Sequence, residues 1–185
     1  MTRWPAGTAD RLHLAALTLF AEQGFEATTV EQIAAAADVT PRTFHRLFRD
    51  KDEVLFFRDA AMELLLIEHL DEALGNGEEP LNAALAAFRA LARTFEDERA
   101  ALAARQALLH DNPRLLGRQL VKQEGWKAAM VARTTEQGTP RDAAVLAVAR
   151  AGAVMQLAFD DWVNGRGRSL VRVLDRIADT EKTVR

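Results

Sequence analysis

The sequence predicts an all-helical protein, and three observations support this fold class. Apolar residues recur at spacings of three and four along most of the chain, the periodicity of amphipathic helices. Tyrosine is absent and alternation of apolar and polar residues is rare, so strand signals are nearly missing. The chain has 185 residues, 49% of them apolar, which is enough for one or two small domains. From the helix start and stop signals, about nine helices are expected.

Composition excludes several classes of protein. Cysteine is absent, which excludes disulfide frameworks and cysteine-ligated metal sites. The formal net charge is −3, so contact with a nucleic acid requires a local cluster of basic residues. The apolar stretches 12–21 and 143–159 resemble an export signal and a membrane span, but Asp10 and Arg150 argue against these readings. A cytoplasmic protein without a membrane segment is expected.

The N-terminal part predicts short helices with clear start signals. A first helix is expected at about residues 8–23, after an arm at residues 1–7, and Gly24 ends it. A second helix begins at Thr28 or Thr29, because each of these threonines is followed three residues later by a residue that can complete a capping box. The apolar residues that follow recur at helical spacing, so one face of this helix is expected to be buried.

A third helix follows a short turn and separates its side chains into two faces. Thr40 is a candidate N-cap, and Pro41 is the first helical residue. Phe44, Leu47 and Phe48 fall on one face, which is expected to be buried. The opposite face carries the basic residues Arg42, His45, Arg46 and Arg49.

From residue 51 onward the chain predicts a larger helical region. A long helix at about 51–74 is expected to connect the two parts. Another begins at Pro80, and the rest are expected at about 97–110, 114–137, 140–164 and 169–179. The helix at 140–164 is rich in small residues: Ala143, Ala144, Ala147, Ala149, Ala151, Gly152 and Ala153. With the helix at 169–179 it can form half of a four-helix dimer interface, and packing within the chain is an equal alternative.

The third helix has the size and charge of an element that contacts DNA. A helix of about eight residues is roughly 12 Å long, close to the width of a B-DNA major groove. Arg42 and Arg46 can reach base edges or phosphates, and Thr40 and Thr43 can donate to phosphate oxygens. Lys51, at the start of the next helix, is a candidate phosphate contact. A solvated basic face without DNA binding explains the same pattern equally well.

Many positions between Leu12 and Leu55 follow a spacing that chance rarely gives. They are Ala15, Ala16, Leu19, Phe20, Gly24, Phe25, Thr28 to Ala34, Val39, Thr40, Thr43, Phe44, Phe48, Lys51 and Leu55. This pattern resembles the TetR-like (tetracycline-repressor-like) transcriptional regulators, whose N-terminal three-helix DNA-binding domain precedes a helical domain for ligand binding and dimerisation. The resemblance implies a helix-turn-helix domain at residues 1–50 and an effector-binding and dimerisation domain at residues 51–185.

The resemblance implies a repressor that binds palindromic operator DNA as a homodimer and is released by a small apolar or amphipathic effector. The DNA-binding residues that it implies are Thr28, Thr29, Thr40, Arg42, Thr43, His45, Arg46 and Lys51. Residues 112–116, Trp126 and the pair Asp161–Trp162 look like actinobacterial regulators of the mycofactocin type, some of which answer to fatty-acyl-CoA. That likeness implies an acyl-CoA-like effector.

Two departures from the family pattern concern DNA binding. Asp38 stands where the family usually has glycine in the turn, and aspartate is among the few other residues that tolerate a left-handed conformation. His45 and Leu47 stand where the family commonly has aromatic residues, often a tyrosine that contacts phosphate. The operator preference of relatives therefore does not transfer to this chain.

The family places its effector among the helices of the C-terminal part, in a pocket expected to be apolar with a few polar anchors. The candidate residues are Phe88, Leu91, Phe95, Leu102, Leu109, Trp126, Met130, Met155 and Phe159, with Arg105, Gln106 and Gln123 as anchors. For each aromatic residue and methionine, a plain core position is the more common alternative.

No catalytic, metal or cofactor site is predicted from the sequence. The four histidines share no H-E-x-x-H or E-x-x-H spacing, and the chain contains no P-loop, G-x-G-x-x-G or G-x-S-x-G motif. Two other function classes stay open from the sequence alone: a helical protein-interaction module that does not bind DNA, and a small helical enzyme.

Overall fold

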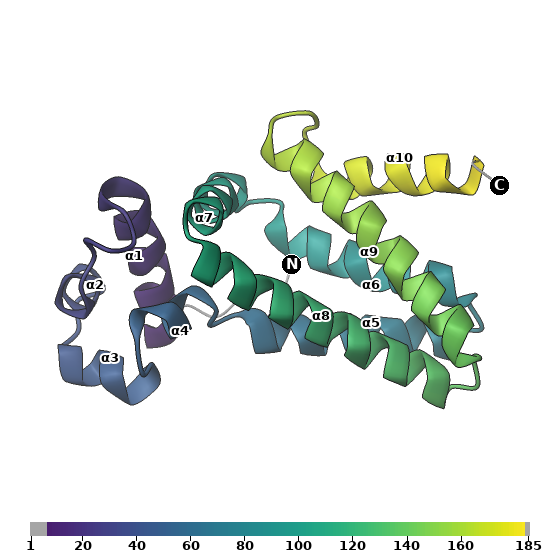
Figure 1. Cartoon of the computed structure of the whole chain (residues 1–185), viewed down its shortest axis with the longest axis horizontal. Coiled ribbons are helices and arrows are strands. Elements are labelled where there is room, and N and C mark those ends of the chain that lie inside the picture. Colours follow the sequence, from purple (N-terminus) through teal and green to yellow (C-terminus); the bar gives the residue numbers. More distant parts are fainter. Residues whose placement is uncertain (1–6, 184–185) are drawn as a thin grey trace. The chain divides into compact units, whose positions relative to one another are not determined.

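A computed structural model describes residues 7–183 of the chain (Figure 1). Within this range there are ten α-helices and no strand, which confirms the predicted all-helical class. The helices are α1 (Thr8–Gln23), α2 (Val30–Ala36), α3 (Pro41–Leu47), α4 (Lys51–Leu55), α5 (Asp59–Gly75), α6 (Pro80–Phe95), α7 (Arg99–Asp111), α8 (Pro113–Glu136), α9 (Arg141–Val163) and α10 (Leu170–Thr183). The arm expected at residues 1–7 lies, except for Gly7, outside the described residues.

The long helix expected at about 51–74 is two helices in the structure. A turn at residues 56–58 separates α4 from α5, which accounts for the tenth helix of the described range. Phe56 in this turn is 4% exposed and belongs to the core around α1. Arg58 is also buried and pairs with Asp10 of α1 at 3.6 Å. Helical periodicity continues through this turn, so it did not reveal the break.

The chain divides into two compact units, and each is built from two stretches of sequence. The first unit comprises Met1–Asp59 and Ala100–Leu120, and the second comprises Ala60–Arg99 and Val121–Arg185. This differs from the boundary expected after residue 50. The physical reason is burial, because Val54 of α4, Leu108 of α7 and Leu115 of α8 lie in the same core as the first three helices.

In the first unit, α2 packs between α1 and α3, and α4 packs against α1 (Figure 1). The core of this unit includes the fully buried side chains of Leu12, Ile33 and Phe44. A hydrogen bond of 2.7 Å joins the Nδ1 atom of His13 on α1 to the Val54 carbonyl oxygen on α4. This bond fixes the end of α4 relative to α1.

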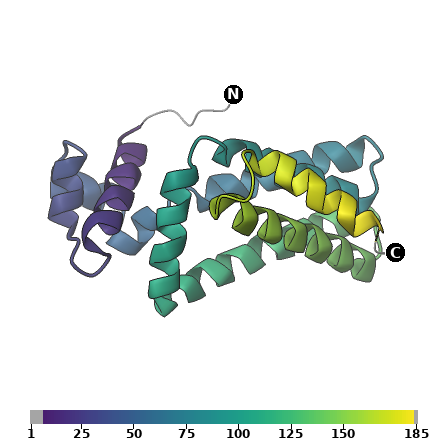
Figure 2. The same ribbon diagram turned by 90° about the horizontal axis from the view of Figure 1, so that it is seen from above.

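In the second unit, α9 packs against α6 and α10, and α10 also contacts α6 (Figures 1 and 2). The small side chains of Ala144, Ala147 and Ala151 are buried and allow the close approach. Asp71 of α5 binds Arg133 of α8 at 2.6 Å. α9 is the one helix among the described residues that is long and apolar enough to cross a membrane by length and composition, and 39% of the apolar window is buried within the protein.

Candidate nucleic-acid interface

The segment from Thr29 to Leu47 forms a helix, a turn and a second helix, each set by local contacts. Thr29 and Gln32 complete a reciprocal capping box at the start of α2, with hydrogen bonds of 3.3 and 2.9 Å. Of the two caps that the sequence allowed, the structure therefore uses Thr29. Asp38 has a φ of 54°, the only positive value among the described residues other than glycine. The turn thus survives with aspartate in place of glycine, as expected.

Helix α3 begins and is anchored as the sequence predicted. The Thr40 hydroxyl accepts a hydrogen bond of 3.2 Å from the Thr43 backbone N–H, and Pro41 is the first helical residue. Phe44 is 0% exposed and Phe48 is 5% exposed, and their rings lie 5.5 Å apart in the core. Seven residues give α3 a length of about 10 Å, which fits a major groove.

Arg42 and Arg46 are the basic side chains that α3 leaves available. Both are exposed, and neither forms an ion pair or hydrogen bond with another described residue. Arg49 differs, because its guanidinium lies 3.7 Å from Asp50 and 3.6 Å from Glu53. The stripe of basic residues predicted from the sequence is therefore reduced to two guanidinium groups that are free to bind an external anion.

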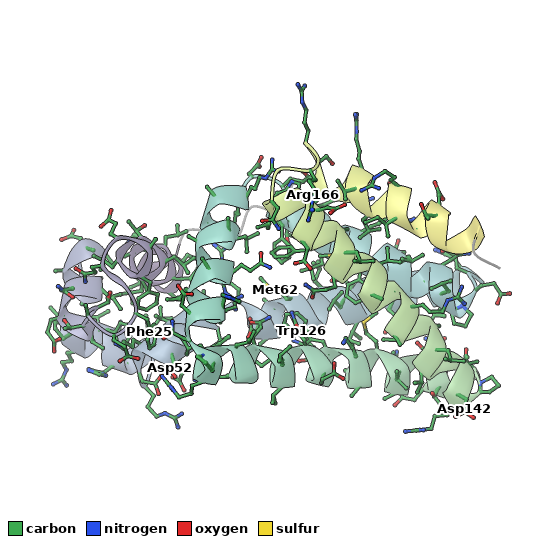
Figure 3. The ribbon with its side chains drawn as sticks, turned by 45° about the horizontal axis from the view of Figure 1, so that its top comes forward. Phe25, Asp52, Met62, Trp126, Asp142 and Arg166 are labelled. Carbon is green, nitrogen blue, oxygen red and sulfur yellow. The ribbon has the colours of Figure 1, made fainter. Side chains whose placement is uncertain are left out.

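Lys51 turns toward the protein rather than toward a phosphate. Its Nζ atom donates to the carbonyl oxygens of Phe25 (2.6 Å), Glu26 (3.3 Å) and Thr28 (3.1 Å), and it lies 4.3 Å from the centre of the Phe25 ring. Phe25 is labelled in Figure 3. Three carbonyl acceptors use the three donors of an ammonium group. Lys51 thus joins the α1–α2 loop to α4, and the engagement of its three donors argues against the predicted contact with a DNA phosphate, which stays a prediction.

Thr28, another residue predicted to bind DNA, is engaged within the protein. Its side chain is 1% exposed, and the hydroxyl donates to the Gly24 carbonyl oxygen at 2.7 Å. Gln23 donates a second hydrogen bond to the same hydroxyl at 3.2 Å. Thr28 therefore closes the loop after α1, whereas its neighbour Thr29 stays exposed. Both threonines were predicted as possible N-caps, and no local sequence pattern distinguishes the N-cap Thr29 from Thr28, which closes the loop.

His45 is exposed on α3, with its ring edge-on to Phe44 at 5.5 Å. Glu31 on α2 is exposed nearby. Its pKa is lowered by a hydrogen bond from its own backbone and by one from Thr29, and the charge of His45 adds to this.

Leu47 lies on the surface, although the sequence predicted it on the buried face of α3. Its exposed fraction is 41%, whereas Phe44 and Phe48 on either side of it in sequence are buried. The helix ends at Leu47, and Phe48 has an extended backbone with φ −137° and ψ 135°. The change in backbone direction turns Phe48 into the core and leaves Leu47 outside.

An ion-pair cluster joins α4 to the start of α8, and the sequence did not predict it. Asp52, labelled in Figure 3, is 6% exposed and forms a two-pronged ion pair with Arg114. Arg118 lies 3.6 Å from the same carboxylate, and its guanidinium lies 4.9 Å from the centre of the Phe56 ring. Asp52 and Arg114 lie 62 positions apart in the sequence, so no local sequence pattern indicates their contact.

The predicted effector residues are divided between the two units. Those in the first unit are Leu102, Arg105, Gln106 and Leu109. Arg105 donates to Gln119 at 2.7 Å, and burial lowers the pKa of its guanidinium, which Asp59 opposes. Leu109 belongs to the core of the unit. Arg105 and Leu109 therefore have partners within the protein.

The other predicted effector residues lie in the second unit. Phe88, Leu91, Phe95, Met130 and Met155 are buried, and Gln123, Trp126 and Phe159 are half-buried. Phe95 and Phe159 meet with ring centres 6.2 Å apart, and Figure 3 labels Trp126 on α8. Two open cavities of this unit, of about 1070 and 600 Å³, are lined by other residues, from the start of α6, the α8–α9 loop, α8 and α9.

Two parts of the chain match the sequence profiles of known protein families. The sequence profile of the bacterial regulatory proteins of the tetR family matches residues 14–56, and the profile of the MftR C-terminal domain matches residues 78–183. The chain belongs to the tetR family. The resemblance seen in the sequence is thereby confirmed, and this is a family of transcriptional regulators rather than of enzymes. Among residues 7–180, no group of three or more His, Asp or Glu side chains could hold a metal ion.

One curated relative and two solved structures are similar to this chain. The chain is 46% identical over 90 residues to the HTH-type transcriptional regulator TcmR of Streptomyces glaucescens. The match spans 49% of this chain and 39% of that protein. A TerR/AcrR-family regulator from Aquifex aeolicus has a TM-score of 0.67 at 19% identity and covers 97% of this chain and 100% of its own. The fatty acid degradation regulator FadR from Bacillus halodurans has a TM-score of 0.64 at 16% identity, with 96% and 94% covered. These two structures show a shared fold.

Proposed function

We propose that the chain is a ligand-responsive repressor that binds palindromic operator DNA as a homodimer and is released by a small apolar or amphipathic effector. Because bacterial DNA lies in the cytoplasm, the proposed site of action is the cytoplasm. The observation that carries the proposal is the pair of exposed guanidinium groups, Arg42 and Arg46, on a helix whose other face is buried through Phe44 and Phe48. The other residues proposed to contact DNA are Thr29, Thr40 and His45, which are exposed, and Thr43, which is half-buried.

The two free arginines give the proposal a matched test on one short segment. Selection of random DNA by the purified protein should enrich a palindromic sequence at moderate salt. Arg42→Ala and Arg46→Ala should each weaken binding to that sequence by about 1–3 kcal/mol if they contact base edges. Arg49→Ala is the control, because its guanidinium is already paired with Asp50 and Glu53 and should change affinity much less.

The salt dependence separates base contacts from phosphate contacts. Removal of an arginine that contacts only a phosphate weakens binding to all DNA sequences and lowers the slope of affinity against salt concentration. An arginine that reads a base changes the preference at one position of the site. Failure to enrich any sequence would overturn the proposal that this protein reads DNA.

The homodimer is proposed to form through α9 and α10. α9 buries one row of alanines within its own unit and exposes a second apolar row, in which Leu146 and Leu157 are 63% and 57% exposed. The exposed Ala149 and Ala153 lie between these leucines. An apolar stripe with small residues at its centre allows a matching helix to approach closely. α10 exposes the charged side chains of Arg172 and Arg176, which suit the rim of such an interface.

Charge placed on this stripe tests the dimer. The double variant Leu146→Glu, Leu157→Glu should sediment as a monomer at a micromolar concentration at which the wild type is a dimer. Leu64→Glu on α5 is the control, because Leu64 is 72% exposed and lies outside α9 and α10. A wild type that is monomeric, or a double variant that stays dimeric, would contradict this interface.

The effector is proposed to bind in the second unit among its aromatic and methionine side chains, and an acyl-CoA is the proposed class. The residues that support this are mostly apolar, with the half-buried Gln123 as a polar group among them. Acyl-CoAs of graded chain length should release the protein from its selected DNA, whereas CoA alone should not. Release by none of the chain lengths would remove the acyl-CoA class and leave the DNA-binding proposal intact.

A further inference from the structure

Leu47 is an exposed apolar side chain at the C-terminal end of α3, the helix that carries the two free arginines. It is 41% exposed on α3, within the same short helix as the free Arg42 and Arg46. At 100° per residue, Leu47 follows Arg46 around the helix and is one turn after Thr43. Its flank of α3 therefore combines the apolar side chain of Leu47 with Thr43, which is half-buried and whose hydroxyl faces that of Thr40 at 3.1 Å.

The major groove offers few apolar groups to such a side chain. Phosphates and most base edges present hydrogen-bond donors and acceptors, and the exposed apolar group among the four bases is the C5-methyl of thymine. The arginines on α3 complement the phosphate charge and place this helix against DNA. A leucine on the same helix then gains most where a thymine methyl removes it from water.

We infer that Leu47 reads a thymine methyl group in each half-site of the operator. This inference rests on the proposed function and extends it, because it assigns a base preference to a residue that lacks hydrogen-bonding groups. Leucine has no hydroxyl or other polar group with which to contact a phosphate. The preference for thymine at this position is therefore expected to be a property of this chain.

Substitution of thymine by deoxyuridine tests the inference, because it removes only the methyl group. In the selected operator, each thymine is replaced in turn, symmetrically in both half-sites, and the affinity of the full-length protein is measured. At one position the wild type should lose about fourfold per half-site, the effect of one buried methyl group, and about fifteenfold for both half-sites.

The Leu47→Ala variant completes a double-mutant cycle. It should bind the thymine operator more weakly than the wild type does, and the deoxyuridine replacement at that position should cost this variant less than twofold. Leu14→Ala is the matched control, because Leu14 is 48% exposed on α1 in the same unit and should keep the full deoxyuridine effect. Circular dichroism melting of both variants verifies that the protein is still folded.

The outcomes separate this inference from the proposed function. If an operator is enriched but no deoxyuridine position couples to Leu47, or if the half-sites contain no thymine that matters, the inference is overturned and the regulator stands. If Leu47→Ala weakens every DNA sequence equally, the side chain supports the helix or the sugar–phosphate backbone, which also overturns it. If no sequence is enriched at all, the proposed function falls together with the inference.

Discussion

The two units hold their functional side chains in different ways. In the first unit, the candidate interface depends on contacts between near neighbours, such as the capping box of Thr29 with Gln32 and the cap of Thr40 with Thr43. In the second unit, several polar contacts join distant parts of the sequence, as between Arg89 and Asp175, which lie 86 positions apart. A short segment can therefore carry the residues proposed to read DNA, although distant residues such as Arg114 and Leu115 complete the unit that supports it.

The largest expected effect comes from the removal of one fully buried aromatic side chain from the core of one unit at a time. Phe44→Ala and Trp162→Ala should each lower the free energy of unfolding of their own unit by about 3–5 kcal/mol, because both side chains are fully buried. Urea unfolding followed by hydrogen exchange at residues of each unit measures this. Leu47→Ala is the control and should stay within about 0.5 kcal/mol. If either variant lowered the protection against hydrogen exchange equally in both units, the units would unfold as one. The contrast between a locally and a globally stabilised unit would then be wrong.

Acid should weaken the first unit through His13. Burial lowers the pKa of His13 to about 4, with Arg58 and Arg105 adding to this and the Val54 carbonyl and Asp10 opposing it. The unfolded chain binds a proton at about pH 6.5, so stability is present above that value and is lost as the pH falls toward 4. The loss at pH 4 should be about 3 kcal/mol.

Comparison of pH profiles isolates the His13 contribution from that of the carboxylates. His13→Asn keeps a donor near the Nδ1 position for the Val54 carbonyl but does not titrate. Its unfolding free energy, measured by urea titration between pH 7 and pH 4, should fall less than that of the wild type. Identical profiles for the two proteins would contradict the lowered pKa.

Lys51→Met separates stability from DNA binding within the first unit. Loss of three charge-assisted hydrogen bonds should lower the free energy of unfolding by about 2 kcal/mol. The slope of DNA affinity against salt should stay the same, because the ammonium group is engaged by carbonyls. A slope reduced by about one would show that Lys51 contacts a phosphate.

The smallest expected effect lies in the turn between α2 and α3. Asp38→Gly should raise the free energy of unfolding by about 0.5 kcal/mol, because glycine adopts a positive φ without steric cost and part of the gain is offset by chain entropy. Asp38→Ala should lower it by about 1 kcal/mol. Chemical denaturation of both variants measures the difference, and equal stability of the two would mean that the backbone at Asp38 carries no strain.

Sequence reasoning reached the parts of the molecule that depend on local rules. The start of α3 at Thr40 and Pro41, the positive φ of Asp38 and the buried Phe44 and Phe48 were all predicted. Where the structure differs from the expectation, the deciding contact often involves residues that are distant in the sequence. Lys51 faces carbonyls more than twenty positions before it, and Phe56 breaks a predicted helix because it enters the core around α1. The exposure of Leu47 depends on the backbone of Phe48, which periodicity does not describe.

The effector residues illustrate the limit of composition as a guide. Apolar side chains such as Phe88 and Met130 suit a pocket and a core equally well, and both are buried in the structure. Leu109 lies in the core of the first unit, although it was predicted beside residues of the second. Periodicity identifies the buried face of a helix but does not identify the helix that covers it.

The discontinuous first unit has a consequence for the engineering of hybrid regulators. An exchange of residues 1–59 between relatives would move the DNA-reading helices without Leu108, Leu115 and Arg114, which complete their core and hold Asp52. Such a hybrid would expose apolar surface on the graft and leave a buried carboxylate without its cation. A transplant that carries residues 100–120 as well, or that changes only the outward side chains of α3, keeps these contacts and is the better route to a regulator with a new operator.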